Sequence, residues 1–200
     1  MSINNFFILA SGSKSRILIL KNLGLNFEKI QHGCDEGYYK KSFLELKYSP
    51  KKISLKLAKN KAKNIKTKNE IIVGSDTVIS FNGKMIEKAK NLSEAKIKIK
   101  KLSGKTHMII SSAAAYFNNR LVWCHSQEVK VKLRKLKDQE IKKYLRSCKP
   151  EILGSVGCYQ VEKNGAMIIE KIDGDFFAVM GFPLFPFLKF LKKFNVKKLL

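Results

Sequence analysis

Residues 6–24, FFILASGSKSRILILKNLG, contain the clearest indication of the fold. The first five form a short apolar run, which is typical of a buried strand, and a Ser/Gly turn follows at 11–13. From residue 15 apolar side chains recur at helical spacing up to Gly24, a common helix stop. A strand, a polar turn and a helix in this order direct free backbone N–H groups toward an anion. The opening of the chain therefore predicts an α/β protein with a cradle for phosphate.

Strands and helices mix throughout the rest of the chain. EIIVGSDTVISFNGKMI, residues 70–86, predicts two strands around an Asn82-Gly83 turn, and residues 107–133 predict a hairpin that turns at Asn118-Asn119. We also expect a strand at 26–31, irregular structure at 34–50, alternating strands and turns at 154–175, and helices at 53–65, 92–105 (capped by Ser93), 137–148 and 183–194. The pattern predicts an α/β fold with at least one mixed sheet, as a single domain over residues 1–200 or two small lobes that share a cleft.

The charge is extreme, and it permits two interpretations. The formal net charge of +24 suggests a nucleic-acid-binding protein, but only four of the 40 basic residues are arginines, the side chains best suited to bidentate contacts with bases and phosphates. Lys, Ile, Asn and Phe are abundant together, which is typical of an A+T-rich genome. We therefore favour a solvated lysine surface, whose positive field would still attract an anionic substrate.

Cysteine placement and hydropathy predict an intracellular protein. The four cysteines are scattered without a Cys-x-x-Cys pair, so neither a zinc site nor a disulfide framework is expected. The N-terminus has no basic leader and only a short apolar run, and no stretch is long enough to span a bilayer. We expect a cytoplasmic location and no membrane partner.

A few polar residues stand where α/β proteins place their chemistry. Asp76 follows the apolar segment 71–73 through Gly74 and Ser75, and we expect it at the carboxyl end of a buried strand, where it could bind a metal or activate water. Asp35 and Glu36 form an acidic pair, one of which could face a cleft if the segment is extended.

Each candidate also has an ordinary structural explanation. Asp76 could cap a turn, the loop at 11–16 could be only a helix cap, since it lacks the P-loop pattern, and the acidic pair could be solvated. Lys61 and Lys88 are two lysines among many, and Glu162, which follows an expected strand at 157–161, is equally unremarkable on its own.

The order of these segments resembles the Maf family of nucleotide pyrophosphatases. The segments FILASGSKSRILILKNLGLNF, CDE, LAKNKA, VGSDTV, an NGK turn with a later lysine, LSGKTH and GCYQVEKNGAMIIEKIDGDFFAVMGFPL match that family in order, over residues 8–191. Several motifs in fixed order are much more specific than any one of them. The resemblance implies a mixed twisted sheet with flanking helices and two lobes around a substrate cleft, as in Maf and ITPase-like proteins.

The resemblance assigns roles by position. The opening Ser-x-Ser-Pro-x-Arg motif matches at Ser11, Ser13 and Arg16, with Lys14 in place of proline. The Asp-Glu pair falls on 35 and 36, the catalytic aspartate on Asp76, and the family's late Gln or Glu on Glu162. The two family lysines fall on Lys61 and Lys88, although Glu87 and Ala89 replace the flanking glycine and proline, and Lys163 replaces the glycine after Glu162.

The implied activity is hydrolysis of a nucleoside triphosphate, with water attack at the α-phosphorus and pyrophosphate as the leaving group. The resemblance implies that Ser11, Ser13, Arg16, Lys61, Lys88 and Glu162 bind substrate. Glu36 and Asp76 would share a divalent cation, Mg²⁺ or Mn²⁺. Ser15, Thr77 and Glu162 would set base specificity, closer to the 7-methyl-GTP branch than to the dTTP and UTP branch. A homodimer is also implied.

Two alternatives remain. One is a non-catalytic protein that binds nucleic acid or the division machinery, supported mainly by the charge. The other is membrane association through an apolar, lysine-bearing helix at 182–200. We favour core packing for that helix, because Gly181-Phe182-Pro183-Leu184 matches the start of the last helix of the family.

Overall fold

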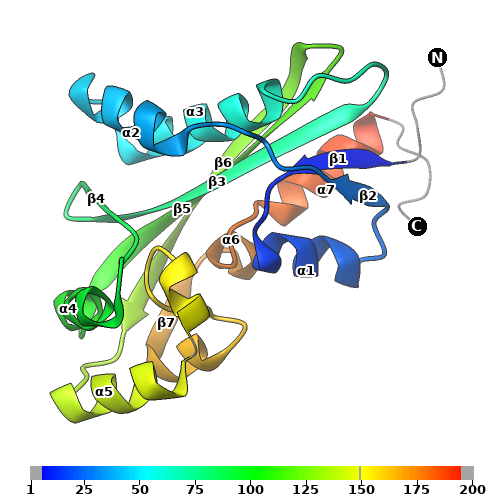
Figure 1. Ribbon diagram of the computed structural model, residues 1–200. Helices are drawn as coiled ribbons and strands as arrows, with labels where there is room; N and C mark the ends of the chain where they lie inside the picture. The colour runs from blue at the N-terminus through cyan, green and yellow to red at the C-terminus, as the bar shows by residue number, and fades with distance from the viewer. Residues whose placement is uncertain (1–5, 149, 195–200) are drawn as a thin grey trace.

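A seven-stranded mixed sheet forms the centre of the computed structural model, which describes residues 6–148 and 150–194 (Figure 1). Its strands are β1 (Phe7–Ala10), β2 (Phe27–Lys29), β3 (Ile71–Phe81), β4 (Lys84–Ile86), β5 (Thr106–Phe117), β6 (Arg120–Leu133) and β7 (Ile169–Asp173). They are ordered β2-β1-β3-β5-β6-β7, with β4 paired to β3. β1 is parallel to β2 and β3, and the other pairs are antiparallel. The predicted α/β class with a mixed sheet is confirmed.

Both predicted hairpins form at residues that tolerate left-handed backbone. Asn82 and Gly83 join β3 to β4 with φ of 51° and 75°, and Asn118 and Asn119 join β5 to β6 with φ of 47° and 61°. Tight hairpin turns need positive φ at their central residues, and Asn and Gly adopt it at low cost.

Helices cover both faces of the sheet. They are α1 (Lys14–Asn22), α2 (Glu36–Glu45), α3 (Pro50–Lys63), α4 (Leu92–Leu102), α5 (Asp138–Ser147), α6 (Phe176–Val179) and α7 (Leu184–Lys193). Successive residues of β1 point to opposite faces of the sheet. Phe7 and Leu9 pack with α1 and α7 on one face, and Ile8 and Ala10 pack with α3 on the other. This alternation explains why β1 is one continuous apolar run.

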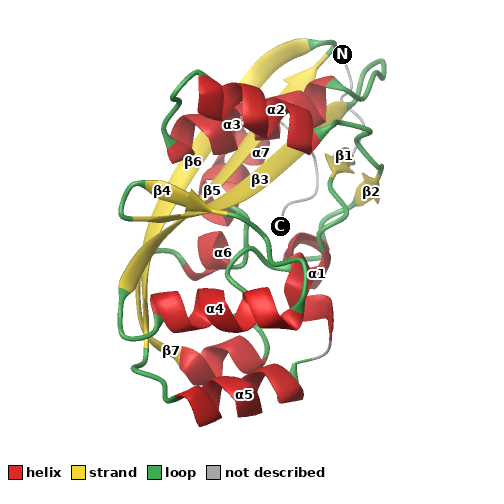
Figure 2. Cartoon of the chain, turned by 60° about the vertical axis from the view of Figure 1, so that its left-hand side comes forward, coloured by secondary structure: helices red, strands yellow, loops and turns green. Residues whose placement is uncertain are grey.

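A second core builds a second lobe. It gathers apolar side chains of α4, α5 and the ends of β3 to β6, with Ile152 and Ile168 from two short 3₁₀ helices, η1 (Pro150–Gly154) and η2 (Asn164–Ile168). Figure 2 shows α4 and α5 at the end of the sheet opposite α2 and α3. The expected two-lobed architecture is confirmed, with the long strands running through both lobes.

Three local expectations are wrong. Residues 34–50 are not irregular, because Asp35 caps α2 by accepting a hydrogen bond from the Tyr38 amide at 3.0 Å. α2 buries no residue, so it has no apolar periodicity to detect. Asn91, not Ser93, caps α4, and residues 157–161 form turns rather than a strand.

The membrane alternative does not match the packing of α7. Leu184, Phe187, Phe190 and Leu191 are buried against the sheet, so the apolar face of the helix is already covered. Residues 195–200, which that alternative also invoked, lie outside the described part of the chain. Within the described ranges, no helix is both long and apolar enough to cross a membrane.

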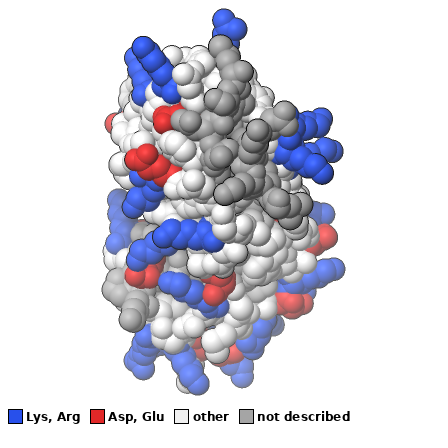
Figure 3. Space-filling view, turned by 90° about the vertical axis from the view of Figure 1, so that its right-hand side faces the viewer, with Lys and Arg blue, Asp and Glu red and all other residues white. Residues whose placement is uncertain are grey.

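Basic side chains are spread widely over the face in Figure 3, with acidic ones among them. Several lysines of the described chain form exposed ion pairs, such as Lys132 with Glu170 at 2.7 Å and Lys100 with Asp138 at 2.9 Å. This distribution agrees with a solvated lysine surface.

Helix α3 lies unusually close to β3 at Gly74. A β-carbon on Gly74 would stand 2.2 Å from the Ala58 carbonyl oxygen and 2.6 Å from the Ala62 amide nitrogen. Only glycine allows this approach, because backbone atoms of a packed helix cannot move aside separately. The approach places the last turn of α3 directly over the centre of β3.

We predict that Gly74→Ala lowers the free energy of unfolding by about 2 kcal/mol, since the methyl group must push α3 off the sheet. Gly154→Ala is the matched control, because a β-carbon at that position would meet no other atom within 4 Å. Urea unfolding of both variants tests this. Equal midpoints for the two would contradict the close packing.

Candidate active site

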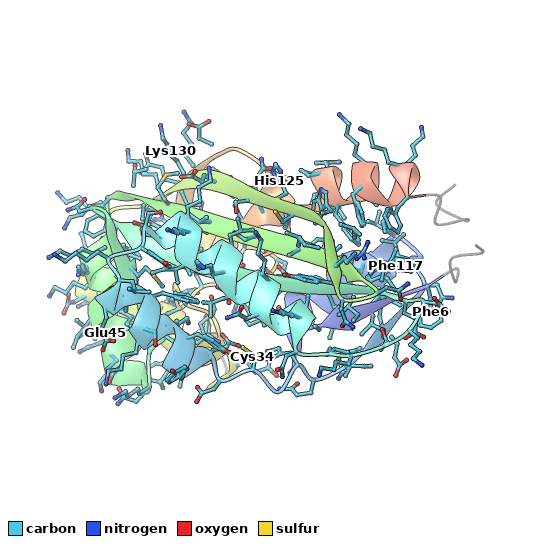
Figure 4. All side chains as sticks on the ribbon, turned by 90° about the horizontal axis from the view of Figure 1, so that it is seen from above. Phe6, Cys34, Glu45, Phe117, His125 and Lys130 are labelled. Carbon is cyan, nitrogen blue, oxygen red and sulfur yellow. The ribbon has the colours of Figure 1, made fainter. Side chains whose placement is uncertain are left out.

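A cavity of about 550 Å³ lies between the two lobes. Its walls come from the loop after β1, the start of α2, the end of α3, the middle of β3, and residues 151–162 and 179–181. Figure 4 shows α2 running from Cys34 outward to Glu45, so only the beginning of this helix reaches the cavity. The cavity is lined by every predicted site residue: Ser11, Ser13, Ser15, Arg16, Glu36, Lys61, Asp76, Thr77, Lys88 and Glu162.

A buried ammonium group joins the two central carboxylates. Lys61 Nζ lies 2.7 Å from Asp76 Oδ1 and 3.0 Å from Glu36 Oε1, and Lys61 and Asp76 are each only 4% exposed. Burial raises the pKa of Glu36, but Lys61, Lys40 and Lys88 lower it further, so that the pKa ends below its ordinary value of 4.5. The carboxylate of Glu36 is therefore ionised at neutral pH.

Asp76 does not lie at a strand end, contrary to our expectation. It is in the middle of β3, where it pairs with Ser112 of β5. The neighbouring strand β1 ends at Ala10, opposite Gly74. β3 therefore extends beyond the end of β1, and the cavity lies beside the part of β3 that is not paired with β1.

One oxygen of Asp76 has no hydrogen-bond partner in the part of the chain that the structure describes. Oδ1 accepts from Lys61, whereas Oδ2 is buried without a hydrogen bond to any residue in the described ranges. A buried acceptor left unpaired is costly, and such atoms commonly serve a ligand, an ion or a water.

Arg16 ties three separate parts of the chain together. Its Nε donates to the Gly181 carbonyl at 2.8 Å, one terminal nitrogen to Ser11 Oγ at 3.0 Å and the other to Thr77 Oγ1 at 2.9 Å. Burial lowers the pKa of Arg16, and the charges of Asp76 and Glu36 oppose that shift. At least two N–H groups of the guanidinium are left for a ligand, since it has five.

The loop before α1 directs polar groups into the cavity. Ser13 caps α1 and its Oγ accepts from the Arg16 amide at 3.5 Å, while Ser11 Oγ accepts from the Ser13 amide at 3.3 Å. A helix N-terminus with free amides favours anions.

Two contacts connect this loop to the opposite wall. Ser15 Oγ donates to Glu162 Oε1 at 2.5 Å, and Lys14 Nζ lies 2.7 Å from Glu151 Oε1. Glu162 belongs to a turn rather than to the end of a strand. Its contact with Ser15 nevertheless joins two of the predicted specificity positions.

Several residues that line the cavity are not among those predicted from the sequence. The polar ones include Gln31, His32, Lys40, Tyr159 and Gln160, and the apolar ones include Ile79, Ile109, Val156, Val179 and Met180. His32 Nδ1 accepts from the Cys34 amide at 3.0 Å, which leaves Nε2 facing Glu36 at 3.5 Å. Lys40 lies one turn after Glu36, so recognising α2 would have identified it. The sequence contains no signal for the others.

Potential metal ligands are few. Within the described residues, no group of three or more His, Cys, Asp or Glu side chains is arranged to hold a metal. Asp76 and Glu36 are the two carboxylates joined through Lys61.

The chain is similar to known proteins over most of its length. A family model described as "Maf-like protein" matches residues 6–194. The chain is 35% identical to a nucleoside triphosphate pyrophosphatase of Caulobacter vibrioides, over 92% of this chain and 93% of that protein. It is 37% identical to a 7-methyl-GTP pyrophosphatase of Bartonella quintana, over 94% and 96%, and 32% identical to one of Rhizobium meliloti, over 93% and 94%.

We predict that Lys61→Met lowers the free energy of unfolding by about 3 kcal/mol at pH 7, because it leaves the buried Asp76 carboxylate without its counter-ion. The pKa of Glu36 should rise, since its burial remains. In the wild type, the lowered pKa of Glu36 stabilises the folded state at every pH above the ordinary glutamate pKa, and this stabilisation is lost as the pH falls through the pKa of Glu36 in the folded protein. The variant should lose this pH dependence. Urea unfolding across pH and NMR titration measure both effects.

Lys63→Met is the control, because Lys63 is exposed on the same helix. If the two variants were equally stable, the buried ion pair would not exist in solution.

Proposed function

The chain belongs to the Maf-like family, and on that premise we propose that it is a hydrolase that cleaves nucleoside triphosphates to monophosphate and pyrophosphate, by water attack at the α-phosphorus. The observation that carries the proposal is the Lys61 ammonium between Asp76 and Glu36, in a cavity whose lining also includes further cations and a helix N-terminus. The volume of about 550 Å³ suits one nucleotide.

Asp76 is the proposed catalytic residue. Its Oδ1 is held by Lys61, which fixes the carboxylate, and its free Oδ2 is placed to orient or deprotonate the attacking water. A fixed carboxylate contributes by positioning as well as by basicity, since a small displacement of water strongly slows the attack.

The phosphate contacts follow from the charges around the cavity. Ser11 and Ser13 line it beside the free amides of α1, and Arg16, Lys61 and Lys88 supply positive charge. Such groups stabilise the charge that develops on the leaving pyrophosphate. Lys40, which also lines the cavity, adds to the same field.

The residues present fit a divalent cation, Mg²⁺ or Mn²⁺. Asp76 has an unpartnered buried oxygen, and Glu36 is the second carboxylate within reach of the same ammonium. Mg²⁺ beside phosphates is usually held by one or two protein carboxylates together with the phosphates, so two suffice here. When bound, the cation would neutralise phosphate charge.

We propose a guanine-like base, including 7-methylguanine. Ser15 engages one oxygen of Glu162, and a carboxylate retains acceptor capacity for a guanine N1–H and amino group. The relatives from Bartonella quintana and Rhizobium meliloti are 7-methyl-GTP pyrophosphatases. Thr77 would contribute indirectly, because its hydroxyl bonds Arg16, Ser111 and the Gly181 carbonyl.

We also propose a domain organisation, a cellular location and an oligomeric state for the enzyme. Residues 1–200 would act as a single domain with both lobes around one site, in the cytoplasm, as a homodimer. The alternative of a non-catalytic protein that binds nucleic acid or the division machinery has only the net charge to support it.

We predict that Asp76→Asn reduces kcat by about 10³-fold, because the amide cannot accept a proton from water. Pyrophosphate release measures the activity, and thermal unfolding shows whether the variant is folded. Near-wild-type hydrolysis by Asp76→Asn would remove Asp76 from its catalytic role.

We predict that Glu162→Gln lowers the ratio of kcat/KM for guanine nucleotides to that for UTP by about tenfold, since a charged acceptor is replaced by a neutral one. A panel of GTP, 7-methyl-GTP, dTTP and UTP measures this ratio. Glu151→Gln is the control, because Glu151 lines the same wall but is paired with Lys14. An unchanged ratio in Glu162→Gln would refute the base assignment.

A further inference from the structure

A buried polar pair lies directly behind the cavity and takes no part in the proposed reaction. His107, the last residue of the LSGKTH motif, is the second residue of β5 and is 2% exposed. Its Nε2 lies 2.5 Å from the hydroxyl of Tyr159, which is 4% exposed, and the two rings meet edge to face at 5.7 Å. Tyr159 lines the cavity, whereas His107 supports it from the sheet.

Both members of the pair are neutral at neutral pH. Burial lowers the pKa of His107 to about 4 and raises the pKa of Tyr159. The two groups share one hydrogen bond, and we take the phenol as its donor, which assigns the His107 proton to Nδ1. That nitrogen has no partner among the described residues, so the tie to Tyr159 is the only hydrogen bond found for this ring.

Residues 155–162 need such support because they form no regular helix or strand. Local bonds shape the segment: the Cys158 amide donates to the Ser155 carbonyl at 3.1 Å, and Ser155 Oγ donates to the Tyr159 carbonyl at 2.6 Å. Cys158 has a φ of 55°, unusual for a residue with a side chain. Within the described ranges, the Tyr159 hydroxyl is what joins this segment to a strand of the sheet by a hydrogen bond.

A displacement of Tyr159 would be transmitted to Glu162. The Lys163 and Gly165 amides both donate to the Gln160 carbonyl, at 3.0 and 3.1 Å. A β-carbon on Gly165 would stand 2.4 Å from that same carbonyl oxygen. The turn from 160 to 165 is therefore closed and tightly packed, and Glu162 moves with it as a unit.

We propose that His107 is a positioning residue for base selection: through Tyr159 it holds residues 155–162 against β5 and so fixes Glu162 opposite Ser15. The inference rests on the proposed role of Glu162 in recognising the base. It gives the histidine of LSGKTH a function distinct from the chemistry at Asp76.

Three variants test the inference. His107→Phe keeps a ring but removes the acceptor, Tyr159→Phe removes the donor, and His107→Gln returns an acceptor near the position of Nε2. Hydrogen exchange of peptides covering 155–165 measures the tether directly, without substrate. The ratio of kcat/KM for GTP to that for UTP, compared with the wild type and Glu162→Gln, measures base selection.

Both Phe variants should speed exchange in 155–165 by about tenfold, with α3 and β6 unchanged, and should lower the GTP to UTP ratio toward that of Glu162→Gln. His107→Gln should restore most of both properties. A fourth variant, which combines His107→Phe with Tyr159→Phe, should change the exchange rate and the GTP to UTP ratio no more than either single Phe variant, because the two residues share one hydrogen bond.

Unchanged exchange in both Phe variants would overturn the tether. A GTP to UTP ratio that shifts in Glu162→Gln but not in the Phe variants would overturn the link to base selection and leave the proposed hydrolysis intact. Absence of hydrolysis by the wild type would instead refute the proposed function itself.

Discussion

The Lys61 ammonium held between Asp76 and Glu36 is the interaction on which the rest of the structure depends. Two carboxylates this close would repel each other, and the ammonium between them offsets that repulsion. Its placement requires α3 to touch β3 at Gly74, and Ser54 reinforces this contact by donating to the Asp76 carbonyl at 3.1 Å. Glycine, serine and lysine at one helix–strand contact thus bring the charges together.

The two lobes contribute different residues to the cavity around Lys61. The lobe built on β1, α1 and α3 supplies the anion-binding loop, the lysine and the aspartate, whereas the lobe with α4, α5 and residues 150–168 supplies the wall that carries Glu162. The Lys61 ammonium offsets one of the two negative charges of Asp76 and Glu36, and the other cations that line the cavity can attract an incoming polyphosphate. In the proposed function, the residues for the chemistry and those for base choice therefore lie on different lobes, and one substrate would span both.

The sequence predicts the sheet and the hairpins well because their signals are local. β1 is apolar on both faces, and Asn82-Gly83 and Asn118-Asn119 favour left-handed turns. α2 is missed because it buries no side chain. Asp76 is wrongly expected at a strand end because β3 stays paired with β5 well beyond the end of β1. The order of motifs points to the predicted site residues, whereas His32 has no local signal and lines the cavity only through tertiary contacts. Lys40 is missed because α2 is missed, and His107 lies in a quoted motif whose pattern does not indicate its contact with Tyr159.

The position of Gly181 late in the sequence means that the site can be completed only late in the synthesis of the chain. Its carbonyl accepts hydrogen bonds from Arg16, Ser75 and Thr77, at 2.8, 3.4 and 3.2 Å, so the first loop and the central strand are both fastened to a residue near the far end of the described chain. In a nascent polypeptide emerging from the ribosome, Arg16 and Asp76 are synthesised long before the Gly181 carbonyl that accepts from Arg16. The arginine is therefore locked in place only after most of the protein has been translated, and a prematurely terminated fragment lacks an assembled centre.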